Sequence, residues 1–165
     1  MKLIGAGLAL VAAAALAGCE KSKFRTYSGP EVTQILVLKE QRKMYLLNGQ
    51  RPLKKYDIAL GGNPVGDKQI EGDLKTPEGG YVINRRNPNS AYHLSLGISY
   101  PNASDVEEAK ALGKPPGGDI FIHGRAGKNK GASPDWTAGC IAVTDDEIEE
   151  VYSMVRTGTP IFIAP

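Results

Sequence analysis

The stretch His123–Cys140, HGRAGKNKGASPDWTAGC, is the part of the chain from which we interpret the rest. The run 119–122, DIFI, is typical of a strand and leads directly to His123. Glycines and basic residues follow, which indicates a loop. The apolar run 141–143 then begins directly after Cys140. The sequence therefore predicts one histidine and one cysteine at the two ends of a loop.

The residues before this stretch are typical of a mainly β domain. Apolar runs at 35–38 and 44–47 flank a polar turn, and Asn48-Gly49 is a tight-turn signal because both residues tolerate positive φ. Residues 55–60 alternate between polar and apolar positions. We predict three antiparallel strands here, with one face buried. Further strands are predicted at 81–83, 91–98 and 161–163.

Two helices are predicted from their start and stop signals. Residues 104–107 form a capping box for a helix of about two turns that ends at Gly113. Residues 144–147 form a second capping box, with acids where a helix N-terminus favours them. Gly158 ends this second helix. Its apolar stripe falls at i, i+3, i+4 and i+7: Ile148, Val151, Tyr152 and Val155.

Length and composition favour one domain. The chain has 165 residues, enough for one substantial core, and its 20 glycines and 11 prolines suit a turn-rich, mainly β fold. The 20 basic and 18 acidic residues are too balanced to indicate a nucleic acid partner. The two histidines and Cys140 lack the spacing of metal ligands, and the glycines at 61–66 lack the ending of a P-loop. We expect no metal and no cofactor.

Residues 1–19 are expected to be an export signal rather than part of the fold. A basic start precedes an apolar run, 3–16, that is too short to span a bilayer. The run ends Leu-Ala-Gly-Cys19, which resembles a bacterial lipobox and implies cleavage before Cys19 and lipid attachment to it. A plain signal peptide or an uncleaved anchor is the alternative. A lipid would hold the domain at a membrane.

The predicted export signal also sets the domain boundaries and the compartment that we expect. Residues 20–31 are polar and are expected to be a tether, and 32–165 form the domain. We expect an exported, lipid-anchored protein facing the periplasm and cell wall. The outer membrane is favoured, because Glu20 stands where an inner-membrane lipoprotein often carries Asp.

The predicted export also suggests that Cys140 is reactive. If Cys19 carries lipid, Cys140 has no disulfide partner in an oxidising compartment, and an unpaired thiol there suggests chemistry. His123 can accept the thiol proton and return one to a departing amine, and N–H groups beside Gly139 can face an oxyanion. The residue types alone indicate acyl transfer by a thiolate. The alternative is a buried cysteine and a structural histidine.

The histidine followed by Thr137-x-Gly139-Cys140 resembles the YkuD-type L,D-transpeptidase catalytic domain, and the likeness extends over most of residues 32–165. The resemblance implies a mainly β fold with two helices and a sandwich-like core, acting on peptidoglycan stem peptides. It makes Cys140 the nucleophile of a thioester intermediate and His123 its base. It also implies N–H groups of Gly139 and Cys140 as oxyanion donors, and the Gly124 carbonyl as the group that orients His123.

The motif departs from the commonest family pattern, which carries histidine at the position of Ala138 and a polar residue at that of Ala142. The run 137–145, TAGCIAVTD, instead resembles the YafK-type branch. One activity attributed to that branch is cutting the link between peptidoglycan and an outer-membrane lipoprotein. Three readings therefore stay open: a transpeptidase, a hydrolase of peptidoglycan or its lipoprotein link, and a non-catalytic wall-binding lipoprotein. A lipoprotein is a further candidate acceptor or substrate.

The loop between the two reactive residues is basic. Its basic residues are Arg125, Lys128 and Lys130, and its one acidic residue is Asp135. Stem peptides carry free carboxylates, so the loop is a candidate binding site for them, and Arg125 is the first candidate residue. A solvated charged loop is the alternative. Thr137 and Trp136 are further candidates for contact with the substrate.

Overall fold

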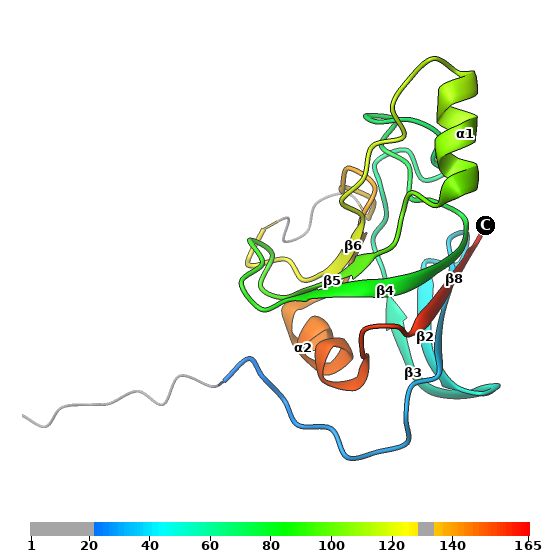
Figure 1. Cartoon of the computed structure of the whole chain (residues 1–165). Coiled ribbons are helices and arrows are strands. Elements are labelled where there is room, and N and C mark those ends of the chain that lie inside the picture. Colours follow the sequence, from blue (N-terminus) through cyan, green and yellow to red (C-terminus); the bar gives the residue numbers. More distant parts are fainter. Residues whose placement is uncertain (1–21, 129–133) are drawn as a thin grey trace, which may run out of the picture.

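The computed structural model describes residues 22–128 and 134–165. Within them, eight strands form one curled mixed sheet in the order β3-β2-β1-β8-β4-β5-β6-β7 (Figure 1). The strands are β1 (Gln34–Leu38), β2 (Lys43–Asn48), β3 (Arg51–Asp57), β4 (Gly79–Asn87), β5 (Ser95–Ile98), β6 (Phe121–His123), β7 (Ile141–Ala142) and β8 (Pro160–Ala164). The helices are α1 (Ala103–Ala111) and α2 (Asp145–Met154). The prediction of a mainly β fold with two helices is confirmed.

The antiparallel meander predicted at the start of the domain is present. β2 pairs antiparallel with both β1 and β3, and Gly49 makes the turn between β2 and β3 at φ +58°. β3 ends at Asp57, earlier than predicted. The next residues leave the meander because they pair elsewhere: Ala59 exchanges two 2.8 Å main-chain hydrogen bonds with Ala142. The segment after β3 is therefore hydrogen-bonded to β7, the strand that follows Cys140.

The last strand joins the two halves of the sheet. β8 lies parallel to β1 and antiparallel to β4, and β4 continues into pairing with β5. The curl of the sheet encloses a core with α2 packed against it (Figure 1). Fully buried members of this core are Ile35, Leu46, Ile83, Leu96, Ile122, Ile141, Ile148, Val151 and Ile161. Each contributes about 1.5–3 kcal/mol by leaving water.

The two helices differ in how well their starts were predicted. α2 has the predicted capping box between Thr144 and Glu147, and its apolar stripe is buried. The predicted start of α1 at Ser104 is wrong. Asn102 is the N-cap, because its side-chain oxygen accepts hydrogen bonds from the N–H groups of Ser104 and Asp105. The Asp105 carboxylate closes the box by accepting the Asn102 N–H.

The strand predicted at 91–98 is shorter than expected and begins at Ser95. His93 lies in a turn before it, with φ +76°, a conformation that a strand residue does not adopt. Its ring nitrogen Nε2 lies 2.9 Å from the Glu149 carboxylate on α2. This long-range contact holds the turn, which carries Tyr92 toward the functional site.

The described part of the predicted tether lies against the domain. Arg25 binds the carboxylates of Glu149 and Asp146 on α2, and Lys23 donates to the main-chain carbonyls of Pro88 and His93. The chain from Ser22 onward passes beneath α2 in Figure 1. The predicted export signal and Cys19 lie outside the described residues. In the described ranges, no helix has the length and apolar character that a membrane span requires.

Candidate active site

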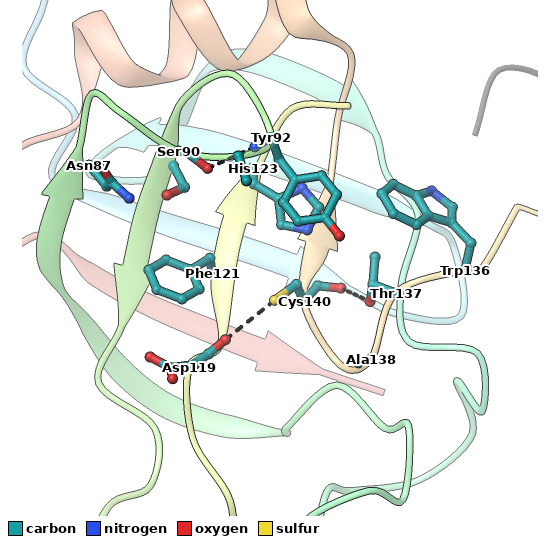
Figure 2. A pocket seen from close by; sticks show the side chains of 12 residues that line it. Asn87, Ser90, Tyr92, Asp119, Phe121, His123, Trp136, Thr137, Ala138 and Cys140 are labelled. Carbon is teal, nitrogen blue, oxygen red and sulfur yellow. Dashed lines mark hydrogen bonds between the residues drawn. The ribbon is translucent and has the colours of Figure 1, made fainter. Parts of the chain in front are cut away.

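His123 and Cys140 line the same pocket because β6 and β7 are neighbours. The two strands pair in parallel, with Ile122 opposite Ile141 and His123 opposite Ala142. Ile122 and Ile141 point into the core, and side chains alternate along a strand, so Cys140 and His123 emerge on the other face. Both line one pocket of about 560 Å³, which Figure 2 shows from close by. Residues 17 positions apart in sequence thus share a cavity.

The imidazole of His123 is held in one orientation. Its Nδ1 lies 2.6 Å from the Gly124 carbonyl oxygen, which can only accept, so Nδ1 carries the hydrogen and Nε2 has the free lone pair in the neutral ring. Burial lowers the pKa of His123, and the nearby Arg125 charge lowers it further, whereas the Gly124 carbonyl acts in the opposite direction. The net effect favours a neutral ring that can accept a proton.

Gly124 has no room for a side chain. A Cβ there would lie 2.5 Å from an Asp145 carboxylate oxygen and 2.9 Å from both Ile148 and the Tyr92 carbonyl. The same Asp145 oxygen accepts the N–H groups of Arg125 at 2.6 Å and Ala126 at 2.9 Å. The first turn of α2 therefore holds the chain that follows the histidine, and glycine lets the two approach.

Two aromatic rings enclose the histidine. Tyr92 stacks on the His123 ring at 4.5 Å between centroids, and Trp136 meets the ring edge at 5.7 Å (Figure 2). These rings exclude water from the imidazole, which is the physical source of its lowered pKa. The sequence reasoning missed Tyr92, because it placed residues 91–94 in a strand. The alternation in that run is compatible with a strand, so no local signal distinguishes the observed turn from a strand.

Cys140 is a free cysteine that lines the pocket and is partly exposed. Its sulfur lies 3.5 Å from the Asp119 main-chain oxygen (Figure 2). Burial raises the pKa of the Cys140 thiol, and the Asp119 charge raises it further, against the opposing effects of the Phe121 N–H and of Lys68. The thiol is therefore protonated at neutral pH, and it needs a base to become a nucleophile.

The turn before Cys140 is built around Thr137. Its hydroxyl donates to the Cys140 carbonyl at 2.7 Å and accepts the Gly139 N–H at 3.1 Å. Gly139 has φ +133°, and a Cβ there would lie 2.7 Å from the Lys75 carbonyl. Thr137, predicted to contact the substrate, thus shapes the turn that presents the thiol. The predicted oxyanion role of the Gly139 N–H requires release from the threonine hydroxyl.

The basic residues predicted to bind carboxylates lie beside the aromatic rings. The Arg125 guanidinium is 5.9 Å from the Trp136 ring, and Lys128 Nζ is 4.6 Å from the Tyr92 ring. Lys130 lies outside the described residues. Asp135, the acid of the loop, is bound to Arg42 at 2.7 Å. Of the charges that this loop brings near the pocket, Arg125 and Lys128 therefore lie beside the Tyr92 and Trp136 rings.

The described ranges, 22–128 and 134–165, place no three His, Cys, Asp or Glu side chains where they could hold a metal ion together. The chemistry that this arrangement supports is that of a thiol and a neutral base. Such a pair transfers acyl groups through a thioester when a carbonyl enters the pocket.

Comparison with known proteins assigns the chain to a family. The YkuD family, described as the L,D-transpeptidase catalytic domain, matches residues 33–163. The YafK protein of Escherichia coli K12 is 33% identical over 137 residues, which are 79% of this chain and 50% of that protein.

The fold is also similar to that of solved structures. The helical cell shape determining protein Pgp2 of Campylobacter jejuni is 29% identical at a TM-score of 0.65, over 87% of this chain and 51% of that one. Bd1075 of Bdellovibrio bacteriovorus is 28% identical at a TM-score of 0.58, over 81% and 48%. The chain thus spans about half the length of these relatives. With the match covering almost all of its described residues, this chain belongs to the YkuD family of L,D-transpeptidase catalytic domains.

Proposed function

We propose that the chain is a cysteine-dependent L,D-transpeptidase that acts on peptidoglycan stem peptides through a thioester. The observation that carries the proposal is that an imidazole oriented by the Gly124 carbonyl and a free thiol line one pocket. Membership of the L,D-transpeptidase family supports the substrate class, and Pgp2, a helical cell shape determining protein, supports a role in the cell wall.

In the first half of the reaction, His123 Nε2 takes the proton from Cys140 Sγ. The thiolate attacks the carbonyl carbon at the L-centre that precedes a D-amino acid, and the carbonyl oxygen becomes an oxyanion. N–H groups of the turn at Gly139 and Cys140 are the candidate donors to it. When the C–N bond breaks, the departing amine takes the proton from His123, and the acyl group stays on sulfur as a thioester.

In the second half, the amine of another stem peptide loses a proton to His123 and attacks the thioester carbon. The C–S bond breaks, and the sulfur recovers the proton. Water in place of the amine gives hydrolysis by the same steps. The run 137–145, which resembles the YafK-type branch, keeps this hydrolytic alternative open, including release of a lipoprotein from the wall.

The test is to incubate the domain with purified tetrapeptide-bearing wall fragments and to measure its intact mass. We expect an acyl adduct on Cys140 and a released D-amino acid, with no adduct in Cys140→Ala. The His123→Gln variant should fold but lose turnover. Absence of an adduct across pH, with a carbapenem-like acyl donor as well, would refute the thioester and leave a non-catalytic binding protein.

Adding an acceptor amine separates the two enzymatic readings. A transpeptidase gives a cross-linked product whose amount rises with the amine, and the free acid falls in proportion. A hydrolase gives the free acid whether or not the amine is present. Both outcomes keep the Cys140 thioester.

The anchor is part of the same proposal. The lipobox-like sequence ending at Cys19 supports export, cleavage before that residue and lipidation, which would hold the domain at a membrane facing the wall. Metabolic labelling with a radioactive fatty acid should mark the full-length chain and fail to mark Cys19→Ala. Equal labelling of both proteins would contradict the anchor without touching the catalytic proposal.

A further inference from the structure

One wall of the pocket is a segment between β4 and β5, residues 88–93, which we call the wall loop. Ser90 and Tyr92 of this loop line the pocket, and Figure 2 shows Tyr92 beside the His123 ring. Hydrogen bonds inside the segment span two residues: the Tyr92 N–H donates to the Ser90 hydroxyl, and the Leu94 N–H donates to the Tyr92 carbonyl, both at 3.1 Å. The position of the loop over the pocket therefore depends on contacts from other elements.

Lys23 connects the two ends of the wall loop. Its ammonium nitrogen Nζ lies 2.7 Å from the Pro88 carbonyl oxygen and 3.3 Å from the His93 carbonyl oxygen. Lys23 belongs to residues 22–31, which we call the strap and which Figure 1 shows passing beneath α2. Hydrogen bonds with a charged donor are stronger than neutral ones, so one side chain of the strap holds both ends of the loop.

Glu149 of α2 connects the strap to the loop a second time. Arg25, 124 residues earlier, donates from both Nε and Nη2 to Oε2 of Glu149, at 2.9 and 2.8 Å. The other oxygen, Oε1, lies 2.9 Å from His93 Nε2, which carries the hydrogen because a carboxylate only accepts. The Glu149 side chain is 11% exposed, so water screens these contacts less than on an open surface. Burial acts to raise the pKa of Glu149, but the contacts with His93 and Arg25 outweigh it and lower the pKa.

We propose that the strap is a positioning element of the active site. Lys23 holds the wall loop directly, and Arg25 holds it through Glu149. The loop in turn keeps Tyr92 stacked on His123, at 4.5 Å between ring centroids. The inference deepens the proposed function, and its catalytic consequence rests on that function.

The strap lies close in sequence to the predicted lipidation site. Only residues 20–22 separate Cys19 from Lys23. The segment that is expected to link the domain to a membrane is therefore the segment that holds the pocket wall. A displacement of the strap would reach the catalytic histidine through Tyr92.

The first test measures the position of the loop without a substrate. Arg25→Gln and Lys23→Met each remove one charged donor from the strap. We expect the amides of Tyr92 and Leu94 to exchange hydrogen with solvent about 10-fold faster in either variant, the size expected for one lost charged hydrogen bond. Acrylamide should also quench the fluorescence of Trp136 more strongly, because the Tyr92 ring covers it at 5.9 Å and it is the single tryptophan.

Lys54→Gln is the matched control. Lys54 lies on β3 and forms an ion pair with Glu150, the neighbour of Glu149 on α2, and its side chain is 41% exposed against 33% for Arg25. The change removes the same charge from the surface of α2 and keeps the contacts of the strap, so exchange and quenching should stay at wild-type values. Arg25→Lys keeps the charge and should restore part of the protection. Melting temperatures of all variants check that the fold is retained.

The second test asks whether the strap acts through Tyr92. In the wild-type background, Arg25→Gln should move the acidic limb of the pH profile of kcat/KM to higher pH, because the His123 imidazole loses part of its enclosure. In the Tyr92→Ala background, the same change should move the limb no further. Any direct effect of the lost Arg25 charge is common to both backgrounds, so the comparison cancels it.

The other charged groups beside His123 are kept in every variant. They are Arg125 and Lys128, which follow it in the chain, and Asp145, which reaches the same segment from α2. A shift of the acidic limb that depends on Tyr92 therefore reports the position of the wall loop.

The outcomes separate this inference from the proposed function. If exchange and quenching in Arg25→Gln and Lys23→Met match those of Lys54→Gln, the strap does not hold the loop and the inference is refuted, whatever the enzyme turns over. An acidic limb that shifts equally with and without Tyr92 overturns the positioning role. If no stem peptide forms an acyl-enzyme, the proposed function fails, and exchange and quenching still decide whether the strap holds the wall.

Discussion

Replacing Thr137 by valine tests whether this side chain holds the turn that presents the nucleophile. Valine has nearly the same shape, so the change removes a hydroxyl without opening a large cavity. Thr137 is 6% exposed. Its hydroxyl joins the Cys140 carbonyl at 2.7 Å to the Gly139 N–H at 3.1 Å. The substitution therefore removes two hydrogen bonds and leaves two main-chain groups without that partner.

The free-energy cost follows from the burial of those groups. A buried polar group that loses its partner costs about 1–3 kcal/mol. Gly139 is buried, so its N–H bears the larger cost, whereas Cys140 is partly exposed and water can replace some of the lost bond. We expect the free energy of unfolding to fall by about 2–4 kcal/mol. The rate of thioester formation should fall as well, because the turn no longer holds the thiol in one position in the pocket.

The assay is urea unfolding followed by tryptophan fluorescence, since Trp136 is the single tryptophan of the chain and adjoins the turn. Thr137→Ser is the matched control, because it keeps the hydroxyl and loses one methyl group, at a cost of about 0.8 kcal/mol. Acyl-enzyme formation is measured by intact mass for both variants. Equal destabilisation by serine and valine, or an unchanged midpoint for valine, would refute the turn-holding role.

Three further predictions concern the catalytic pair. Because enclosure lowers the pKa of His123, the imidazole stays neutral below the ordinary histidine range, and kcat/KM should be maintained to lower pH. Tyr92→Ala exposes the ring and should move the acidic limb of the pH profile of kcat/KM to higher pH. An acidic limb that stays in place or moves to lower pH would contradict the role of the enclosure. Because burial raises the pKa of Cys140, iodoacetamide should alkylate the resting thiol fast only in alkaline solution; rapid alkylation near neutral pH would show a resting thiolate instead. Gly124→Ala should lower the free energy of unfolding by about 1–3 kcal/mol, measured by urea unfolding, because its Cβ would collide with Asp145; an unchanged midpoint would show that α2 can move aside.

Much of the architecture could be predicted because its causes are local. Short apolar runs marked β1 and β2, and the Asn48-Gly49 turn marked the start of the third strand, although not its end. The capping box at Thr144 and the apolar stripe behind it marked α2, since both signals lie within one short segment. The start of α1 was misplaced because two cap-forming residues, Asn102 and Ser104, stand two positions apart, and sequence does not rank them.

The parts that were missed have causes far away in the chain. Tyr92 reaches the imidazole because His93 adopts a positive φ, and the His93 ring is held by Glu149, 56 residues later. Arg25 binds the same Glu149 carboxylate across 124 residues, because the strap lies against α2. Neither contact leaves a periodic pattern in its own segment.

By itself, the sequence determined most of the strand and helix types and predicted one thiol and one imidazole as the reactive pair, because apolar patterns, caps and side-chain chemistry are properties of short segments. Only the tertiary structure decided the protonation of that pair. The pKa of His123 is lowered and that of Cys140 is raised by burial, and burial depends on rings and main-chain groups from distant elements. The two opposite pKa shifts are thus a property of the folded pocket, because the free-energy cost of a charge depends on the surrounding solvent and dipoles.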